Sequence, residues 1–303
     1  MTLTGGNTST QNSTQNSTQN STQLDALLRG RARGADAPRS TSRDNGARGV
    51  PTLLCASGRG GSGTTMISAL LAVAAAGEGY RVLLIDADDL VGPLSMLLAV
   101  TPRAGWQDLR GARVSPGDVA TPVSTTLTLV AGGAPRTGEQ GALTAAERRA
   151  CMRRLSALTD GMDLVVVDCG SRFEAVAAAF TPHADERLLA ITAGGDPVSL
   201  AATYALCKAV HARVGALPQE LLVNRHDGRD ASRCFDAVDA GTRQFLGTSI
   251  RFAGAVPSDP TLDAALRAGM PFPDAAAGSP AAIAAHDVVM RALAGASHSR
   301  PGV

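Results

Sequence analysis

Short apolar runs recur along the chain and alternate with longer stretches of small and apolar residues. The first run covers 51–56, and an uninterrupted small, apolar series follows at 66–76. A second run, 81–86, and a third, 162–168, each end in an aspartate. The short runs are typical of buried strands and the longer series is typical of a helix. This order predicts an α/β fold with a doubly wound, mostly parallel sheet and helices on both faces.

A glycine-rich loop separates the first predicted strand from the helix. It keeps the spacing of the phosphate-binding G-x-x-x-x-G-K-[ST] loop, but Thr64 stands where the lysine belongs. Backbone N–H groups in such a loop, and the N-terminus of the helix after it, bind anions whatever side chains are present. Glycine-rich stretches are also common as simple turns, but the strand–loop–helix order favours a nucleotide site. The predicted nucleotide contacts are Gly58, Arg59, Gly60, Gly61, Ser62, Gly63, Thr64 and Thr65.

The missing lysine changes what this loop is expected to do. Lys208 is the sole lysine among 28 lysine and arginine residues, and it lies far from the loop in sequence. A loop lysine adds a charge-assisted hydrogen bond to phosphate, worth about 1.5 to 3 kcal/mol. A threonine hydroxyl cannot replace that charge, so we expect weak nucleotide binding and slow or absent hydrolysis.

Carboxylates follow the second and third apolar runs. Asp86 and Asp168 end these runs, and Asp88 comes two residues after Asp86. Carboxyl ends of parallel strands meet at the ligand edge of a sheet. The hydroxyl of Thr65 and the carboxylates of Asp86 and Asp168 are therefore predicted to hold Mg²⁺. An aspartate that caps a following helix has the same appearance, so each one alone carries little weight.

Together these motifs resemble the MinD/ParA group of deviant-Walker ATPases, which are P-loop NTPases of the SIMIBI class, over residues 50–295. Their loop reads K-G-G-x-G-K-[ST], and Arg59 holds the position of the first lysine. The resemblance implies a homodimer in which Arg59 reaches the phosphates of the other subunit and Asp88 positions the attacking water. It also implies that Asn224, in LLVNR, reads adenine and that Pro257, in AVPSD, lies in the loop over the base.

Within this group the chain is most similar to the FlhG/FleN flagellar-number regulators. Their D-Q-A-x-x-L-R segment precedes the first strand, and QLDALLR at 23–29 occupies that place with its glutamine and aspartate displaced. A free amphipathic turn explains 23–29 equally well. The resemblance implies an ATP- and Mg²⁺-dependent regulator of flagellar number or placement, with a flagellar GTPase or a polar-localisation protein as partner. Three alternatives stay open: a nucleotide-independent pseudo-ATPase scaffold, a ParA-type partitioning protein and a pilus-assembly positioning protein.

The composition divides the chain into one domain and two flanking segments. Residues 1–49 contain three Asn-Ser-Thr-Gln repeats followed by an arginine-rich stretch, a composition that predicts disorder. The P-loop domain is predicted at 50–295 and a disordered tail at 296–303. Two stretches rich in Gly, Pro and Thr, 101–122 and 131–146, are predicted to be surface connections.

Charge and hydropathy give expectations about partners and location. The formal net charge of +1 provides no general attraction to nucleic acid, so no specific nucleic-acid partner is expected. The five cysteines lack C-x-x-C spacing, which favours reduced thiols. Without a signal segment or an apolar run of transmembrane length, the chain is expected to be cytoplasmic. The apolar positions of 281–293, which include Ile283, predict a helix that packs on the sheet, with peripheral contact at the inner membrane as the alternative.

Overall fold

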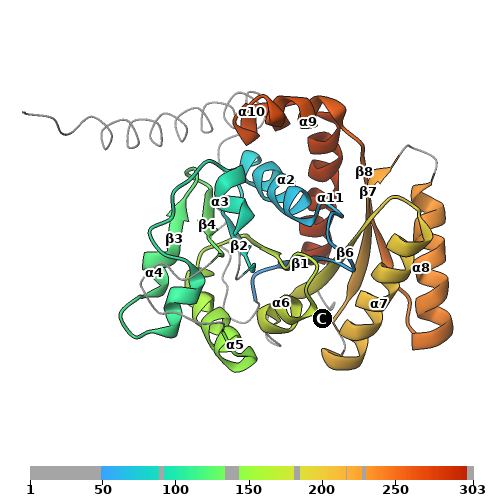
Figure 1. The fold of residues 1–303 in the computed structure, drawn as a ribbon, viewed down its shortest axis with the longest axis horizontal. Helices are drawn as coiled ribbons and strands as arrows, with labels where there is room; N and C mark the ends of the chain where they lie inside the picture. Colours follow the sequence, from blue (N-terminus) through green and yellow to red (C-terminus); the bar gives the residue numbers. More distant parts are fainter. Residues whose placement is uncertain are drawn as a thin grey trace, which may run out of the picture.

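One eight-stranded sheet organises the molecule (Figure 1). The computed structural model describes residues 49–88, 92–133, 143–180, 185–215, 217–226 and 230–298. The strand order is β3-β4-β2-β5-β1-β6-β7-β8, and every neighbouring pair is parallel except β3 with β4. The strands are β1 (Thr52–Ser57), β2 (Val82–Asp86), β3 (Ala120–Pro122), β4 (Leu127–Val130), β5 (Leu164–Asp168), β6 (Glu186–Ala193), β7 (Gln219–His226) and β8 (Arg251–Pro257).

Helices cover both faces of the sheet, as the sequence predicts. Figure 1 shows α2 and α11 on one face and α5, α6 and α7 on the other. The helical elements are α2 (Thr64–Gly77), α3 (Pro93–Leu97), η1 (Trp106–Arg110), α4 (Pro116–Val119), α5 (Ala145–Arg154), η2 (Leu155–Leu158), α6 (Phe173–Ala179), α7 (Pro197–Arg213), α8 (Ala231–Leu246), α9 (Pro260–Arg267), α10 (Phe272–Ala276) and α11 (Pro280–His298). The doubly wound α/β fold is confirmed.

Two apolar cores flank the sheet. Leu53 and Leu84 pack among the residues of α2 and α11, whereas Leu54 and Leu83 pack with α5, α6 and α7 on the other face. All four side chains are buried, and burial of a leucine stabilises a fold by about 1.5 to 3 kcal/mol. Because both faces of a parallel sheet are covered, its strands appear in the sequence as continuous apolar runs.

The prediction that 101–122 is a surface connection is partly wrong. Trp106 and Leu109, both in η1, are fully buried, and 120–122 forms the antiparallel strand β3. Glycine and proline signal an irregular backbone path, but they do not say how deeply that path is buried. The segment AVPSD was likewise expected as a loop, yet its residues up to Pro257 complete β8.

The C-terminal helix packs on the sheet, as predicted. In α11, the side chains of Ala285, Val288 and Val289 are buried against α2 and β8. Ile283, expected on that apolar face, is 51% exposed instead. The helix continues to His298, beyond the predicted domain end at 295; the segment 1–48 and residues 299–303 lie outside the described ranges.

No helix among the described residues has both the length and the apolar character needed to cross a membrane.

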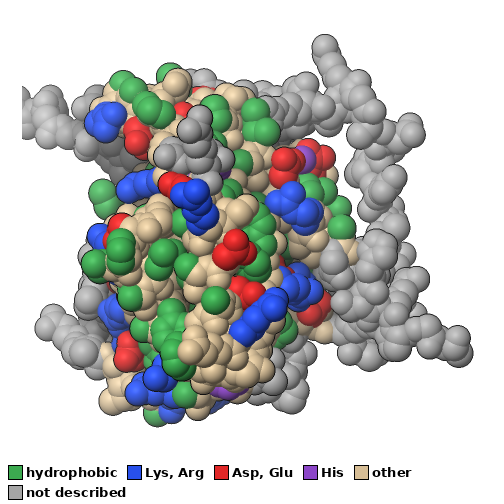
Figure 2. Space-filling view, turned by 90° about the vertical axis from the view of Figure 1, so that its right-hand side faces the viewer, with side chains coloured by type: hydrophobic (Ala, Val, Ile, Leu, Met, Phe, Trp, Pro, Cys, Tyr) green, Lys and Arg blue, Asp and Glu red, His purple; other side chains and the backbone are tan. Residues whose placement is uncertain are grey.

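Basic and acidic side chains alternate on the face formed by α7 and α8 (Figure 2). On α8, Arg243 forms an ion pair with Asp239 at 2.7 Å, and Arg233 lies 3.8 Å from Asp230. Figure 2 shows apolar side chains between the basic and acidic side chains of this face. The described part of this face therefore presents mixed charge and no continuous basic stripe.

Candidate functional site

The loop between β1 and α2 has the backbone of an anion site. Gly61 and Gly63 have positive φ angles of 81° and 82°, which favour glycine because a side chain would be strained there. At Gly58 a Cβ atom would lie 2.0 Å from the carbonyl oxygen of Ala202 on α7, so only glycine fits. Among the residues that the structure describes, no side chain caps the N-terminus of α2. Its first N–H groups are therefore available to a phosphate.

The Thr64 side chain connects the start of α2 to the end of β1. It is buried, and its hydroxyl lies 3.0 Å from Ser57 Oγ, at the end of β1. Ser57 Oγ in turn donates to the carbonyl oxygen of Arg59 at 2.9 Å, and Ser62 Oγ donates to the same oxygen at 3.0 Å. The residue in the lysine position thus holds the base of the loop and provides no charge to a ligand.

Two arginines bring positive charge to the loop. Arg59 Nη1 donates to Ser199 Oγ at 3.2 Å and lies 3.7 Å from Asp196 Oδ1, both at the N-terminus of α7. Arg225 Nη1 donates to the carbonyl oxygen of Gly61 at 3.4 Å. Arg225 has a φ angle of 55°, an unusual conformation for a residue with a side chain. Both guanidinium groups therefore lie beside the loop that lacks a lysine.

Asn224 contacts the loop directly. Its Nδ2 donates to the carbonyl oxygen of Ser62 at 2.9 Å, and its Oδ1 accepts from the backbone N–H of Arg225. A Cβ atom on Gly63 would lie 2.5 Å from Nδ2, so this packing depends on a glycine there. Asn224 thus links β7 to the phosphate loop, while its role in reading adenine stays a prediction.

Asp86 and Asp168 lie side by side on neighbouring strands. They are register partners on β2 and β5. Burial, together with the charge of Asp168, raises the pKa of Asp86 to about 7, although the backbone N–H groups of Leu94 and Asp88 oppose the shift. Burial also raises the pKa of Asp168, against hydrogen bonds from Thr65 and Gly170. Among the described groups that shift these two pKa values, none carries a positive charge, which a cation would supply.

The oxygen donors here fit Mg²⁺. The Thr65 side chain is hydrogen-bonded to Asp168, which brings the first turn of α2 to the end of β5. Among the described residues, no group of three or more His, Cys, Asp or Glu side chains is arranged to hold a metal ion. Mg²⁺ usually takes one or two protein carboxylates and completes its shell with water and phosphate oxygens. Thr65, Asp86 and Asp168 would hold the ion in that way.

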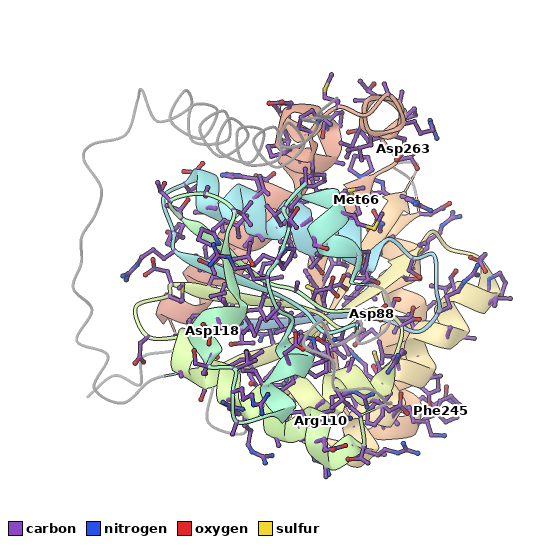
Figure 3. All side chains as sticks on the ribbon, turned by 60° about the vertical axis from the view of Figure 1, so that its left-hand side comes forward. Met66, Asp88, Arg110, Asp118, Phe245 and Asp263 are labelled. Carbon is purple, nitrogen blue, oxygen red and sulfur yellow. The ribbon has the colours of Figure 1, made fainter. Side chains whose placement is uncertain are left out.

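The segment that carries Asp88 is held by backbone contacts that the sequence did not indicate. Trp106 Nε1 donates to the carbonyl oxygen of Asp86 at 2.8 Å, and Gln107 Nε2 donates to that of Asp88 at 3.3 Å. The N–H of Gly133 also donates to the Asp88 carbonyl, at 2.7 Å. Figure 3 labels Asp88 to the right of the centre of the view and Arg110, the last residue of η1, below it.

The structure thus gathers most of the predicted residues around one loop. The loop itself, Asn224, Asp168 and Asp86 are connected through the contacts above, and Pro257 ends β8 as the register partner of His226 on β7. Sequence reasoning missed the supporting groups, which are Ser57, Trp106, Gln107, Asp196, Ser199 and Arg225. Of these, the capping pair Asp196 and Ser199 had a usable signal, because Asp-Pro-x-Ser is typical of a helix start.

Solved structures of MinD/ParA-type proteins share the fold. MinD with Mg-ADP from Pyrococcus horikoshii is 19% identical, has a TM-score of 0.63, and the match covers 83% of this chain and 99% of that one. The ATP complex of an aspartate-to-alanine variant of McdA from Cyanothece is also 19% identical, with a TM-score of 0.62, and the match covers 82% of this chain and 97% of that one. At this level of identity the similarity establishes the fold alone.

Two sequence comparisons identify a relative and a family. Antiactivator FleN of Pseudomonas aeruginosa is 27% identical over 221 residues, which are 72% of this chain and 77% of FleN. The model of the family described as cellulose biosynthesis protein BcsQ matches residues 51–293. Because this match covers most of the chain, the chain belongs to the BcsQ family of MinD/ParA-type P-loop proteins.

Proposed function

We propose that this protein is a switch that binds Mg-ATP without a P-loop lysine and uses it to associate with a second copy of itself. One observation carries the proposal: the Thr65–Asp168 hydrogen bond joins a free helix N-terminus to two buried carboxylates whose pKa values are raised. This combination provides an anion site next to a cation site. A turn with a purely structural role would not need both.

Different groups of the chain would contact different parts of the nucleotide. The backbone N–H groups of the loop and of the first turn of α2 donate to phosphate oxygens. Mg²⁺, when bound, neutralises phosphate charge at Thr65, Asp86 and Asp168. Arg225 and Arg59 supply the remaining positive charge near the loop. Relatives of this fold have been solved with Mg-ADP and with ATP, which supports the same ligand here.

Hydrolysis is proposed to be slow. The Thr64 hydroxyl is engaged with Ser57, so this position stabilises no charge that develops on the phosphates during transfer. Asp88 is the residue proposed to orient a water. Arg59 would have to leave Asp196 and Ser199 before it could reach a second subunit; both partners in its ion pair are about half exposed, at 48% and 51%, so little energy opposes this release.

The cellular role is proposed to be regulation of flagellar number or placement, through a flagellar GTPase or a polar-localisation protein. The similarity to antiactivator FleN supports it, since that relative is matched over 77% of its length. A second candidate is regulation of cellulose synthesis, and the family match at 51–293 favours it. Deletion of the gene separates the two: altered flagellar counts support the first candidate, and altered cellulose output with normal flagella supports the second.

Sedimentation velocity tests the switch. The full chain is measured alone, with Mg-ADP and with Mg-ATP, and Asp88→Ala is included to prevent turnover from emptying the site. We expect monomers in the first two conditions and dimers with Mg-ATP, most completely in Asp88→Ala. An unchanged monomer under all three conditions, in both proteins, would refute the switch.

A further inference from the structure

The η1 segment contacts the backbone of both aspartates of the Asp-Ala-Asp segment 86–88. Trp106 Nε1 donates to the carbonyl oxygen of Asp86, and Gln107 Nε2 donates to that of Asp88. Gly132 packs against the same two carbonyls, since a Cβ atom there would lie 2.1 Å from Asp88 O and 2.7 Å from Asp86 O. These contacts hold the backbone of the segment that carries the Asp88 carboxylate.

The orientation of the Gln107 carboxamide is fixed by Asp88. The side chain is 1% exposed, and its Oε1 has no hydrogen-bond partner among the described residues. Turning the amide over would place Oε1 against the Asp88 carbonyl oxygen, two acceptors face to face. The present orientation keeps the bond to Asp88 and leaves Oε1 unpaired next to Gly105, where a Cβ atom would lie 2.7 Å from Oε1. The contact with Asp88 therefore decides how this buried amide is placed.

From these contacts we propose that Gln107 is a positioning residue for Asp88 in the nucleotide reaction. Its Nε2 holds the Asp88 backbone so that the carboxylate is correctly placed to orient the attacking water. The proposal rests on the proposed Mg-ATP function, because Asp88 has a reaction to serve only if nucleotide binds. It assigns a role to η1, a segment expected from sequence to be a surface connection.

The chain offers a closely matched control in Gln219, at the start of β7. Gln219 Nε2 donates to the carbonyl oxygen of Cys207 at 3.3 Å, the same distance as in the Gln107 bond, and its Oε1 is also buried and unpaired among the described residues. Gln219→Met and Gln107→Met thus remove the same kind of interaction. Of these two glutamines, only Gln107 donates to the 86–88 segment.

Two measurements on the full chain test the role. Amide hydrogen exchange of a peptide spanning 86–96 is followed without nucleotide, and the dissociation constant and single-turnover rate are measured with Mg-ATP. Gln107→Met should speed exchange in that peptide and lower the rate at least about tenfold, with a change in the dissociation constant of less than about threefold, as expected for a group that acts only on the chemical step. Gln219→Met should leave all three unchanged.

A second variant guards against misfolding of the first. Gly105→Ala keeps Gln107, but the added Cβ atom displaces its Oε1. This variant should therefore also speed hydrogen exchange and lower the single-turnover rate, by smaller factors than Gln107→Met. Wild-type exchange in both Gln107→Met and Gly105→Ala, or a wild-type rate in Gln107→Met, would overturn the positioning role while the proposed function stands. Failure of the wild-type chain to bind Mg-ATP would instead overturn the proposed function, and the positioning role with it.

Discussion

At the scale of single residues, Thr64 and Asp86 define the site. Thr64 occupies the lysine position but directs its hydroxyl to Ser57, so the loop is structurally intact and lacks a charge. Asp86 is a fully buried carboxyl whose pKa is raised to about 7. A neutral threonine and an uncompensated carboxyl have separate consequences, one for phosphate affinity and one for the stability of the ligand-free protein.

Restoring the lysine should strengthen nucleotide binding. In Thr64→Lys the added ammonium group reaches the phosphates, and a charge-assisted hydrogen bond of about 1.5 to 3 kcal/mol corresponds to roughly 10- to 150-fold in the dissociation constant of Mg-ATP. Thr64→Ser keeps a hydroxyl for Ser57 and should bind like the wild type. Fluorescence titration with a labelled ATP analogue gives both constants; equal constants for wild type and Thr64→Lys would show that the lysine position does not face phosphate.

The raised pKa of Asp86 predicts a pH dependence for the ligand-free protein. The folded state keeps a proton on this carboxyl at pH values where the unfolded chain, with an ordinary pKa, has already lost it. Stability should therefore fall as pH rises from about 4 to about 7, by at most about 1.4 kcal/mol per pH unit, and level off above that.

Urea unfolding without Mg²⁺ or nucleotide, between about pH 5 and about pH 8, measures this slope. Asp86→Asn should shift the plot of unfolding free energy against pH and reduce its slope, since the asparagine does not titrate. The difference between the two curves isolates Asp86 from other titrating groups. Parallel curves would show that Asp86 does not carry a proton in the folded state.

At the scale of elements, glycine positions determine how close the loop comes to α7. Gly58 has no room for a side chain beside the Ala202 carbonyl, whereas a Cβ atom on Gly60 would have nothing within 4 Å. Gly58→Ala should therefore destabilise the fold by about 1 to 3 kcal/mol and weaken nucleotide binding. Gly60→Ala should change stability by less than about 0.5 kcal/mol. Thermal unfolding of the two variants checks this; equal losses would contradict the close approach to α7.

The apolar pattern predicted the strands and helices of the core, but it did not predict how deeply the irregular segments are buried. The strands that end in Asp86 and Asp168, and helix α2, were predicted because burial on both faces leaves continuous apolar runs. The burial of Trp106 in a glycine- and proline-rich stretch was not predicted. Contacts such as Asn224 with Ser62 join segments distant in sequence, and local pattern carries no information about them.

At the scale of the whole molecule, Arg59 connects the state of the monomer to association. In the single chain it contacts Asp196 and Ser199 on α7. Because this ion pair is exposed, Arg59→Ala should change unfolding stability by less than about 1 kcal/mol. The same variant should lose Mg-ATP-dependent dimers in sedimentation velocity. A variant that dimerises like the wild type would remove Arg59 from the interface.

The most direct test of the central claim is titration calorimetry of the full chain with ATP in the presence and absence of Mg²⁺. We expect saturable binding of one nucleotide per chain that depends on Mg²⁺ and is lost in Asp168→Ala, because the ion and the loop hold the phosphates together. No heat of binding from the wild-type chain, with clear binding by Thr64→Lys, would contradict it and leave a P-loop scaffold that works without nucleotide.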